Sequence, residues 1–153
     1  RRIVGSVVLG VLFFLLMVSS VCVGFRFSAQ PAGEILFAQV EQSQWDVYDI
    51  TYDEEGKKLK YGDCTQDAPL LDHIAGLHLQ LTTESPDLFA QSKHAQILLR
   101  APKHGCMLNF FGNYVRIILY DYSLPQRHPE YSRTAYYYMD SQPDWQFLSS
   151  CIA

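Results

Sequence analysis

The sequence predicts an all-β domain, an antiparallel barrel of about eight strands with one or two short helices, behind one N-terminal transmembrane helix. Three observations lead to this fold class. Residues 3–25 form a run of 23 residues without a charge, apolar and polar residues alternate with period two along much of the remaining chain, and aromatic residues make up 14% of the sequence. Because only 18% of the residues are charged, an intrinsically disordered chain is excluded.

The uncharged run is long enough to cross a bilayer. It would form a helix of about 34 Å, and the hydrocarbon core of a bilayer is about 30 Å thick. Arg1 and Arg2 precede the run, so the positive-inside rule places the N-terminus in the cytoplasm and the following domain outside it. A cleaved secretory signal is the alternative, although signal cores are usually about 7–15 residues long. We therefore predict an anchor over residues 1–25, a linker over 26–34 and an exported β-barrel domain over 35–153.

Small residues recur on one side of the predicted anchor, as two small-xxx-small pairs. Such pairs let membrane helices approach closely, so this face indicates a partner helix, although glycine and serine are common in membrane helices for other reasons. The pairs lie about four helical turns apart. Their residues are Ser6, Gly10, Ser20 and Gly24.

The exported part is acidic. Arg1 and Arg2 account for two of the 12 basic residues, which leaves 10 basic against 16 acidic residues and a net charge of −6 for the remainder. Direct binding of nucleic acid, which needs a basic surface, is therefore not expected.

Short alternating segments separated by turn residues predict the strands. Gly112 and Asn113 form the strongest of these signals, a two-residue hairpin turn. Short helices are expected at 69–74 and at 85–91, the latter with Ser85 as the N-cap. Simple up-and-down connection would pair the last strand with the first. The predicted strands are residues 45–52, 58–62, 77–82, 95–101, 106–111, 114–122, 133–139 and 145–151.

Three of the four cysteines belong to the exported part, where disulfides form. Up-and-down order places Cys64, Cys106 and Cys151 at the same end of the sheet, which predicts one bridge and one thiol. Cys64–Cys151 is favoured, while Cys106–Cys151, Cys64–Cys106 and three thiols stay open. No cysteine pair has metal-ligand spacing, so neither a metal site nor any cofactor is expected.

Catalysis is not expected, because none of the motifs that mark catalytic or phosphate-binding sites occurs. Histidines, whose ordinary pKa lies near 6.5, are candidates for sensing mild acidification. The alternative is that they are ordinary solvated loop residues. These candidates are His73, His78, His94, His104 and His128.

A barrel of eight strands has an interior that side chains fill or that holds one small apolar ligand. Aromatic and aliphatic residues on the predicted strands are candidates to face that interior, and tyrosine adds a hydroxyl that could orient a ligand. A filled aromatic core is the equal alternative. The candidate interior residues are Trp45, Tyr48, Ile50, Leu79, Phe110, Ile117, Leu119, Tyr136, Tyr138 and Phe147.

The anchor over residues 3–25, the Glu41-Gln-Ser-Gln-Trp45 entry to the first strand and the strand succession through Trp145 resemble the ToxS class of bacterial inner-membrane proteins, which includes the VtrC and PsaF/MyfF types. The resemblance implies a lipocalin-like (calycin-like) periplasmic barrel. It also implies a heterodimer with a membrane-bound, winged-helix transcription activator of the ToxR type, which the barrel stabilises and which completes the barrel. Some members of the class admit bile salts or other amphipaths, or respond to pH.

We therefore expect a single-pass inner-membrane protein, not an enzyme, that regulates or chaperones such an activator in virulence signalling. Its barrel interior would sense a small amphipathic ligand, such as a bile salt or a fatty acid, or pH. A structural accessory subunit of a larger membrane complex is the first alternative. The second is an exported lipocalin-like carrier, which would require cleavage of the anchor.

Overall fold

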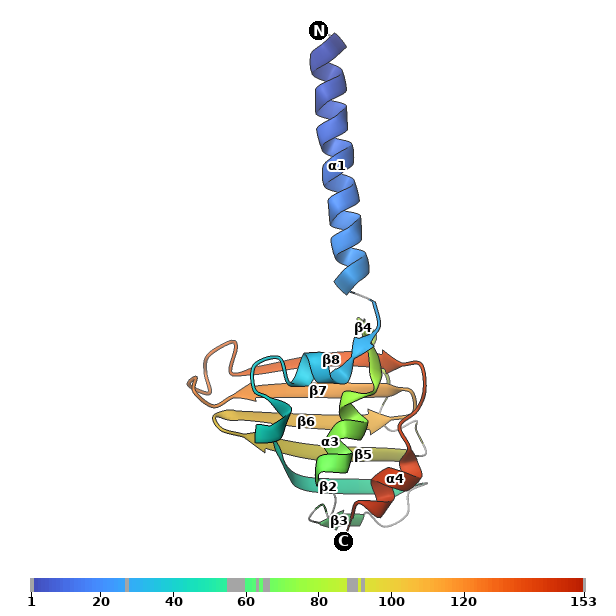
Figure 1. The fold of residues 1–153 in the computed structure, drawn as a ribbon, viewed down its shortest axis with the longest axis vertical. Coiled ribbons are helices and arrows are strands. Elements are labelled where there is room, and N and C mark those ends of the chain that lie inside the picture. Colours follow the sequence, from blue (N-terminus) through green and yellow to red (C-terminus); the bar gives the residue numbers. More distant parts are fainter. Residues whose placement is uncertain are drawn as a thin grey trace.

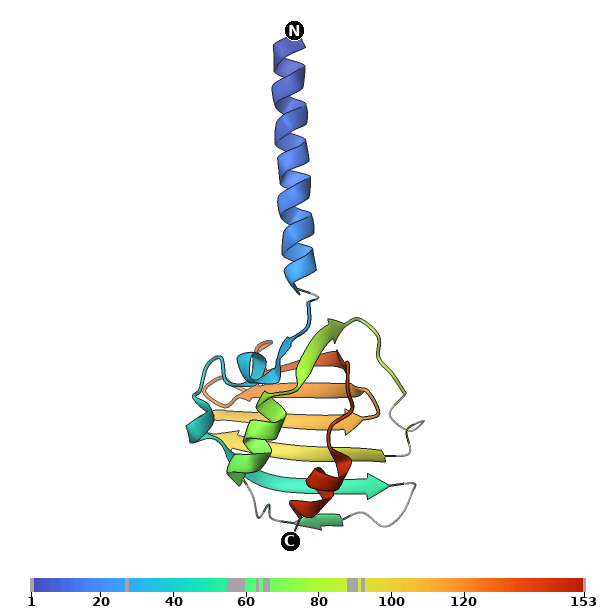
Figure 2. The same cartoon turned by 45° about the vertical axis from the view of Figure 1, so that its right-hand side comes forward.

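The computed structural model describes residues 2–26, 28–54, 60–62, 64, 67–87, 91 and 93–152, and gives only the backbone for 2–6, 21–26 and 60–62. Helix α1 (Arg2–Arg26) extends away from a β-rich domain (Figures 1 and 2). The side chains of residues 7–20 are all exposed. In the part of the chain that the structure describes, no helix reaches the length and hydropathy of a membrane-spanning segment.

The domain is built on one antiparallel sheet of eight strands, which confirms the predicted all-β character. β5, β6, β7 and β8 follow one another as neighbours, while β4 lies outside β8 and β2 lies outside β5. β1 and β3 form the two edges. In sheet order the strands are β1 (Gln30–Pro31), β4 (His78–Thr82), β8 (Ser132–Met139), β7 (Tyr114–Asp121), β6 (His104–Phe111), β5 (Lys93–Ala101), β2 (Asp46–Glu54) and β3 (Lys60–Gly62).

The sheet is open, so the closed barrel that up-and-down connection predicts is wrong. The expected last strand, 145–151, is helix α4 (Trp145–Ser150). The Asp144 carboxylate caps this helix by accepting a hydrogen bond of 2.9 Å from the backbone N–H of Phe147. Leu148 and Cys151, three residues apart, are both fully buried, as expected for one face of a helix. Among the described residues, the predicted last strand is therefore not there to pair with the predicted first strand.

Three helices cover one face of the sheet, as Figures 1 and 2 show. They are α2 (Ala32–Leu36), α3 (Asp67–Ala75) and α4. We call the face that they cover the inner face and the opposite one the outer face. The helix expected at 69–74 is confirmed and is longer than one turn. The helix expected at 85–91 is wrong for residues 85–87 and 91, which have no regular structure, and residues 88–90 lie outside the described part.

The predicted linker 26–34 carries regular structure. β1 pairs with β4, and the backbone N–H of Ala32 donates a hydrogen bond of 2.7 Å to the carbonyl of Leu77. Ala32 is 1% exposed, and a Cβ atom at Gly33 would lie 3.2 Å from the Cβ of Ala75. The close packing of α2 on α3 thus ties the start of the domain to the sheet. A short helical turn, η1 (Gln42–Gln44), then leads into β2.

The core lies between the inner face and the helices. One row of residues in register across four strands shows it: Ile50, Ile97, Leu108 and Ile117 are each at most 2% exposed. Leu70 and Ile74 of α3 and Leu148 of α4 face this layer. Alternate side chains of the central strands β5, β6, β7 and β8 face the other side, so the sheet has one apolar and one mixed face.

The central hairpin has the turn that the sequence predicts. Gly112 adopts a φ of +58°, a conformation that glycine accepts without strain, and the turn joins Phe111 to Tyr114 as a register pair. Because the pairing runs without a shift, the start of β6 meets the end of β7. His104 therefore lies opposite Asp121.

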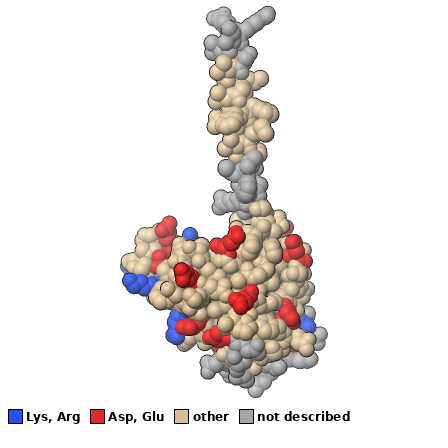
Figure 3. All heavy atoms as spheres, viewed as in Figure 1, with Lys and Arg blue, Asp and Glu red and all other residues tan. Residues whose placement is uncertain are grey.

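Charged side chains are spread over the surface with the helices. Figure 3, drawn in the view of Figure 1, shows acidic groups across this face and basic groups at only a few places. This side of the described chain has no continuous basic patch.

Candidate functional site

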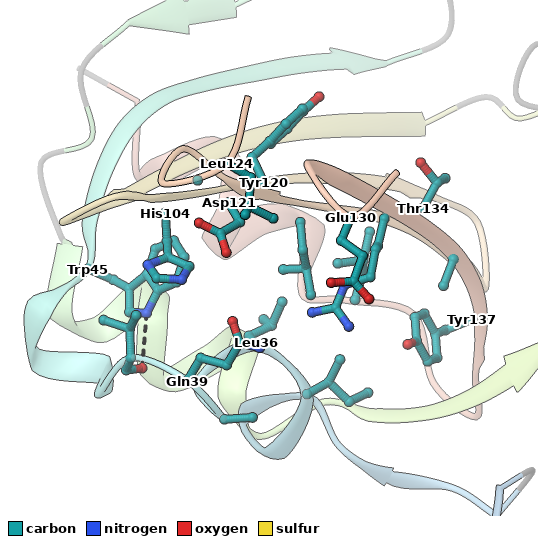
Figure 4. A pocket seen from close by; sticks show the side chains of 18 of the residues that line it. Leu36, Gln39, Trp45, His104, Tyr120, Asp121, Leu124, Glu130, Thr134 and Tyr137 are labelled. Carbon is teal, nitrogen blue, oxygen red and sulfur yellow. Dashed lines mark hydrogen bonds between the residues drawn. The ribbon is translucent and has the colours of Figure 1, made fainter. Parts of the chain in front are cut away.

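A pocket of about 560 Å³ lies between the inner face and the segment that leads from α2 to β2 (Figure 4). The volume is in the range of sites for small organic ligands. Its walls are mainly apolar. The apolar lining comprises Ile35, Leu36, Ala38, Val40, Trp45, Leu81, Ile117, Leu119, Leu124, Ala135 and Tyr137.

The wall opposite the sheet is held by Trp45. Its indole N–H donates a hydrogen bond of 3.2 Å to the carbonyl of Val40, and its ring lies 6.2 Å from that of Phe37. Trp45 is 5% exposed, so this large ring both closes the segment on itself and faces the pocket. Indole rings bury a large area while keeping one donor satisfied. The pocket wall is therefore a packed structure rather than a loose loop.

Polar groups gather at one side of the pocket, around the ends of β6, β7 and β8. They include His104, Asp121, Glu130 and Arg133. The imidazole Nδ1 of His104 lies 3.0 Å from the carbonyl of Pro102 and donates to it, which leaves Nε2 for another contact. We call these four residues the polar rim.

Within the polar rim, the surroundings of Asp121 lower the pKa of its carboxyl group. Hydrogen bonds from the hydroxyl and then from the backbone N–H of Ser123 lower the pKa of its carboxyl group. Burial opposes these hydrogen bonds by raising the pKa, and the nearby His104 and Arg133 lower it by smaller amounts. Asp121 is consequently an anion in neutral solution, with His104 and Arg133 beside it on the two neighbouring strands.

The arrangement is suited to holding an amphipathic molecule. The apolar walls can cover a hydrocarbon body, while the polar rim offers both hydrogen-bond donors and acceptors to a head group. Among the described lining residues there is neither a serine nor a cysteine that could act as a nucleophile. Within the same described part, no three His, Cys, Asp or Glu side chains are grouped to hold a metal ion.

Six of the ten predicted interior residues lie on the inner face. Trp45, Ile117 and Leu119 line the pocket. Ile50, Leu79 and Phe110 lie on the same face but in the closed part of the core, where each is at most 1% exposed.

Three predicted interior tyrosines are instead on the outer face. A β-bulge between Val47 and Asp49 breaks the alternation of β2, so Tyr48 points outward and is 57% exposed. On β8 it is Tyr137 that faces inward, at 9% exposed, which sends Tyr136 and Tyr138 outward. Periodicity alone does not fix the phase of three consecutive tyrosines.

Phe147 is also placed differently from its prediction. It lies on α4 rather than on a strand, packs at the border of the core and is half-buried. Its ring lies 5.2 Å from the imidazole of His73, edge to face. It therefore joins α4 to α3 and does not line the pocket.

The five histidines lie apart. His73 lies on α3, where its Nε2 is 3.4 Å from the backbone N–H of Asp144, and burial lowers the pKa of its imidazole while the Asp144 carboxylate raises it by less. His94 faces Asp53 across β2 and β5, with 3.7 Å between Nε2 and Oδ2. His104 belongs to the polar rim. His78 is exposed on β4, and His128 accepts a hydrogen bond from the backbone of Glu130 in the β7–β8 loop.

The cysteines and the anchor residues complete the list of candidates. Cys64 and Cys151 are hydrogen-bonded to each other through their side chains, whereas Cys106 is buried in the sheet and burial raises the pKa of its thiol to about 12.

The hydroxyl of Ser20 donates a hydrogen bond of 2.8 Å to the carbonyl of Leu16, and a Cβ at Gly10 would touch nothing within 4 Å. The side chains of Ser6 and Gly24 are outside the described part.

The sequence analysis does not predict the polar rim as a group, although the sequence contains one signal for it. Counting back equally from the Gly112–Asn113 turn places His104 opposite Asp121, so the pair follows from the hairpin register. Arg133 enters the same corner because it pairs with Leu119 on the next strand. The contribution of Leu36 and Val40 could not be predicted, since the sequence indicates no helix between 26 and 44.

Comparison of the chain with protein families, with curated proteins and with solved structures gives no match. The resemblance to the ToxS class stays a prediction.

Proposed function

We propose that this chain is a membrane-anchored periplasmic binding protein that regulates and stabilises a membrane-bound transcription activator of the ToxR type, with its inner-face pocket as the ligand site. The observation that carries the proposal is the pocket itself: an apolar chamber of about 560 Å³ with the polar rim at one side. The class of ligand that fits is a small amphipathic anion.

The polar rim favours a bile salt over a simple fatty acid. Arg133 can donate two parallel hydrogen bonds to a carboxylate or sulfonate head group. Asp121 and Glu130 can accept hydrogen bonds from hydroxyl groups, which bile salts carry on their ring system and fatty acids lack. The walls around Trp45 and Leu119 would cover the apolar face of the rings.

The anchor and the open sheet support the regulatory part of the proposal. The uncharged run of residues 3–25 and the arginines before it favour a single membrane span with the β domain in the periplasm. The sheet ends in the edge strands β1 and β3. An edge strand offers backbone donors and acceptors to a strand from a partner, which is how an activator could complete the barrel.

Ligand binding is tested by filling the pocket from one strand. Ala135→Phe places a large ring in the pocket, whereas Ser132→Phe places the same ring on the outer face of β8. Binding of deoxycholate, below its critical micelle concentration, to the full chain in lipid nanodiscs is measured by calorimetry. We expect Ala135→Phe to weaken binding at least tenfold and Ser132→Phe to leave it unchanged. Equal binding by all three proteins would contradict the pocket as the site.

The regulatory role is tested by copurification. A tagged full chain is extracted in mild detergent from cells of its source, and the bound proteins are identified by mass spectrometry. We expect a single-span protein with a winged-helix domain, in equal amount with the tagged chain. Enrichment of respiratory or secretion subunits instead would favour the structural accessory role and contradict the regulatory one.

A further inference from the structure

Two cysteines from distant parts of the chain meet beside the edge of the sheet. Cys64 follows β3, and Cys151 follows the last turn of α4. Cys64 forms an antiparallel bridge with Ile152, the residue next to Cys151. Residues paired in this way have Cα atoms about 4.5–5.5 Å apart. Because Cys151 directly precedes Ile152 in the chain, the same pairing brings the backbone of Cys151 beside Cys64.

The side chains also meet. The thiols of Cys64 and Cys151 are hydrogen-bonded to each other, so their sulfur atoms face one another. Cys151 is fully buried, while Cys64 is half-buried and packs against the same core. Cys64 is thus the more exposed of the two residues, and Cys151 is held next to it.

From this juxtaposition we propose that Cys64 and Cys151 form a disulfide that fastens α4 and the C-terminal residues to the β3 edge, and that Cys106 is left as a thiol. Cys106 lies on β6, separated from β3 by β5 and β2. It is 3% exposed, and burial raises the pKa of its thiol to about 12, which makes it a poor nucleophile as well as a distant one.

The oxidation is a thiol–disulfide exchange with a disulfide-bearing oxidant, either a dithiol–disulfide oxidoreductase or oxidised glutathione. The thiolate of Cys64 attacks one sulfur of the oxidant, forms a mixed disulfide and releases the first thiol. Cys151 then loses its proton, attacks the Cys64 sulfur and releases the second thiol. The two protein thiols are oxidised and the oxidant's disulfide is reduced to two thiols.

The bridge would close a chain segment that contains β4 to β8, so its effect on stability should be large. It would hold α4 over the inner face, where Leu148 and Phe147 meet the core and His73 of α3. It would also keep Ile152 on Cys64 and cover part of the sheet edge. Formation of the disulfide can be tested in solution, independently of the compartment of the protein and of its ligand.

The full chain in nanodiscs is incubated with oxidised glutathione, alkylated without reduction, digested and mapped by mass spectrometry. We expect a cross-linked peptide pair that joins Cys64 to Cys151, with Cys106 recovered as a thiol alkylated only after unfolding. Recovery of both Cys64 and Cys151 as alkylated thiols, or a bridge that contains Cys106, would overturn the proposal.

Thermal unfolding gives the second readout. Dithiothreitol should lower the Tm of the oxidised wild-type chain by roughly 10 °C. The Cys64→Ser/Cys151→Ser variant should start at the lower Tm and show no response to dithiothreitol. Cys106→Ala is the matched control: whatever its starting Tm, it should keep the full response. A response that persists in the double variant would also overturn the proposal.

Discussion

The two faces of the sheet are formed by the same strands but differ in burial. On the inner face Ile97, Leu108 and Ile117 form a continuous apolar layer beneath three helices, and the pocket opens where the helices leave the sheet uncovered. On the outer face Tyr48 and Tyr138 are 57% and 38% exposed. The comparison teaches that the aromatic residues, which make up 14% of the sequence, occur on the outer surface of the sheet as well as in the interior.

The outer face carries contacts between aromatic and charged side chains. Arg100 lies over the ring of Tyr48, with 5.0 Å between the guanidinium carbon and the ring centroid. Tyr120, Tyr122 and Tyr131 form a cluster with ring centroids 5.9–6.2 Å apart. These contacts stay exposed or half-exposed, whereas the inner-face side chains exclude water. Stability should therefore depend mainly on the inner face.

The largest difference that we expect between the two faces is in how much one aromatic ring contributes to the free energy of unfolding. Phe110→Ala removes a ring that is 1% exposed and should lower the free energy of unfolding by about 3–5 kcal/mol. Tyr138→Ala removes a ring of similar size from the outer face and should cost about 1 kcal/mol or less. Urea unfolding of the detergent-solubilised full chain, followed by near-UV circular dichroism, measures both. Equal costs would contradict the division between the faces.

Ligand binding should depend on the charge of the polar rim and not on charge in the nearby β7–β8 loop. Arg133→Gln removes the guanidinium that faces the pocket and should weaken deoxycholate binding about tenfold, which corresponds to about 1.4 kcal/mol. Arg127→Gln changes an exposed arginine of the β7–β8 loop that does not line the pocket, and should have no effect. Calorimetry on the full chain in nanodiscs provides the comparison. A loss of affinity shared by both variants would indicate attraction by net charge only.

The helical cover of the inner face depends on the start of α4. Asp144→Ala removes the carboxylate that accepts the hydrogen bond from Phe147, and should cost about 1 kcal/mol of unfolding free energy. Asp140→Ala, in the same connection but outside the cap, is the control. Urea midpoints of the two variants are compared. A smaller shift for Asp144→Ala than for Asp140→Ala would show that the cap does not hold the helix.

The smallest expected effect is a pH dependence carried by His73. Because the pKa of His73 is lowered in the folded state, the unfolded chain binds a proton first as the pH falls below about 6.5. The contribution of His73 to stability is thus fully present above that pH and is lost as the pH falls toward the lower folded pKa. Protonation would also remove the acceptor at Nε2 for the backbone N–H of Asp144.

The measurement for His73 is the change in Tm between pH 7.5 and pH 5.5. This change should be smaller in His73→Gln than in the wild-type chain. His128→Gln, in the exposed β7–β8 loop, should leave it as in the wild type. If both variants keep the wild-type dependence, the helix contact around His73 is not the pH-sensitive element.

Strands whose pattern alternates cleanly could be predicted from the sequence, whereas two of the three helices that cover the inner face, α2 and α4, could not. The Leu77–Leu79–Leu81 alternation and the Gly112–Asn113 turn both specify local structure, and both are confirmed. The residues 145–151 are compatible with a strand by composition, and only the Asp144 cap and the burial of Leu148 with Cys151 decide for a helix. Long-range placement of β4 beside β8 depends on tertiary packing that no local pattern encodes.

The pocket residues could also be predicted from the sequence only in part. Trp45, Ile117 and Leu119 could be predicted as interior because each lies in a strong apolar context. The prediction for Tyr48 is wrong because a β-bulge, which the sequence does not mark, adds one residue before Ile50 and turns Tyr48 to the outer face. The polar rim required the register of three strands at once. Position in the sheet, rather than residue type, decides which side chains face a ligand.

The most direct test of the central claim, that the inner face holds the ligand, uses the two tryptophans of the chain as position markers. Trp45 lines the pocket, while Trp145 lies on α4 outside the lining, next to Tyr52. Brominated stearate, which quenches indole fluorescence on contact, is titrated into full-chain Trp145→Phe and Trp45→Phe proteins in nanodiscs. We predict saturable quenching of Trp45 that deoxycholate reverses, and no saturable quenching of Trp145. Equal quenching of both tryptophans, or saturation at Trp145 alone, would contradict the account.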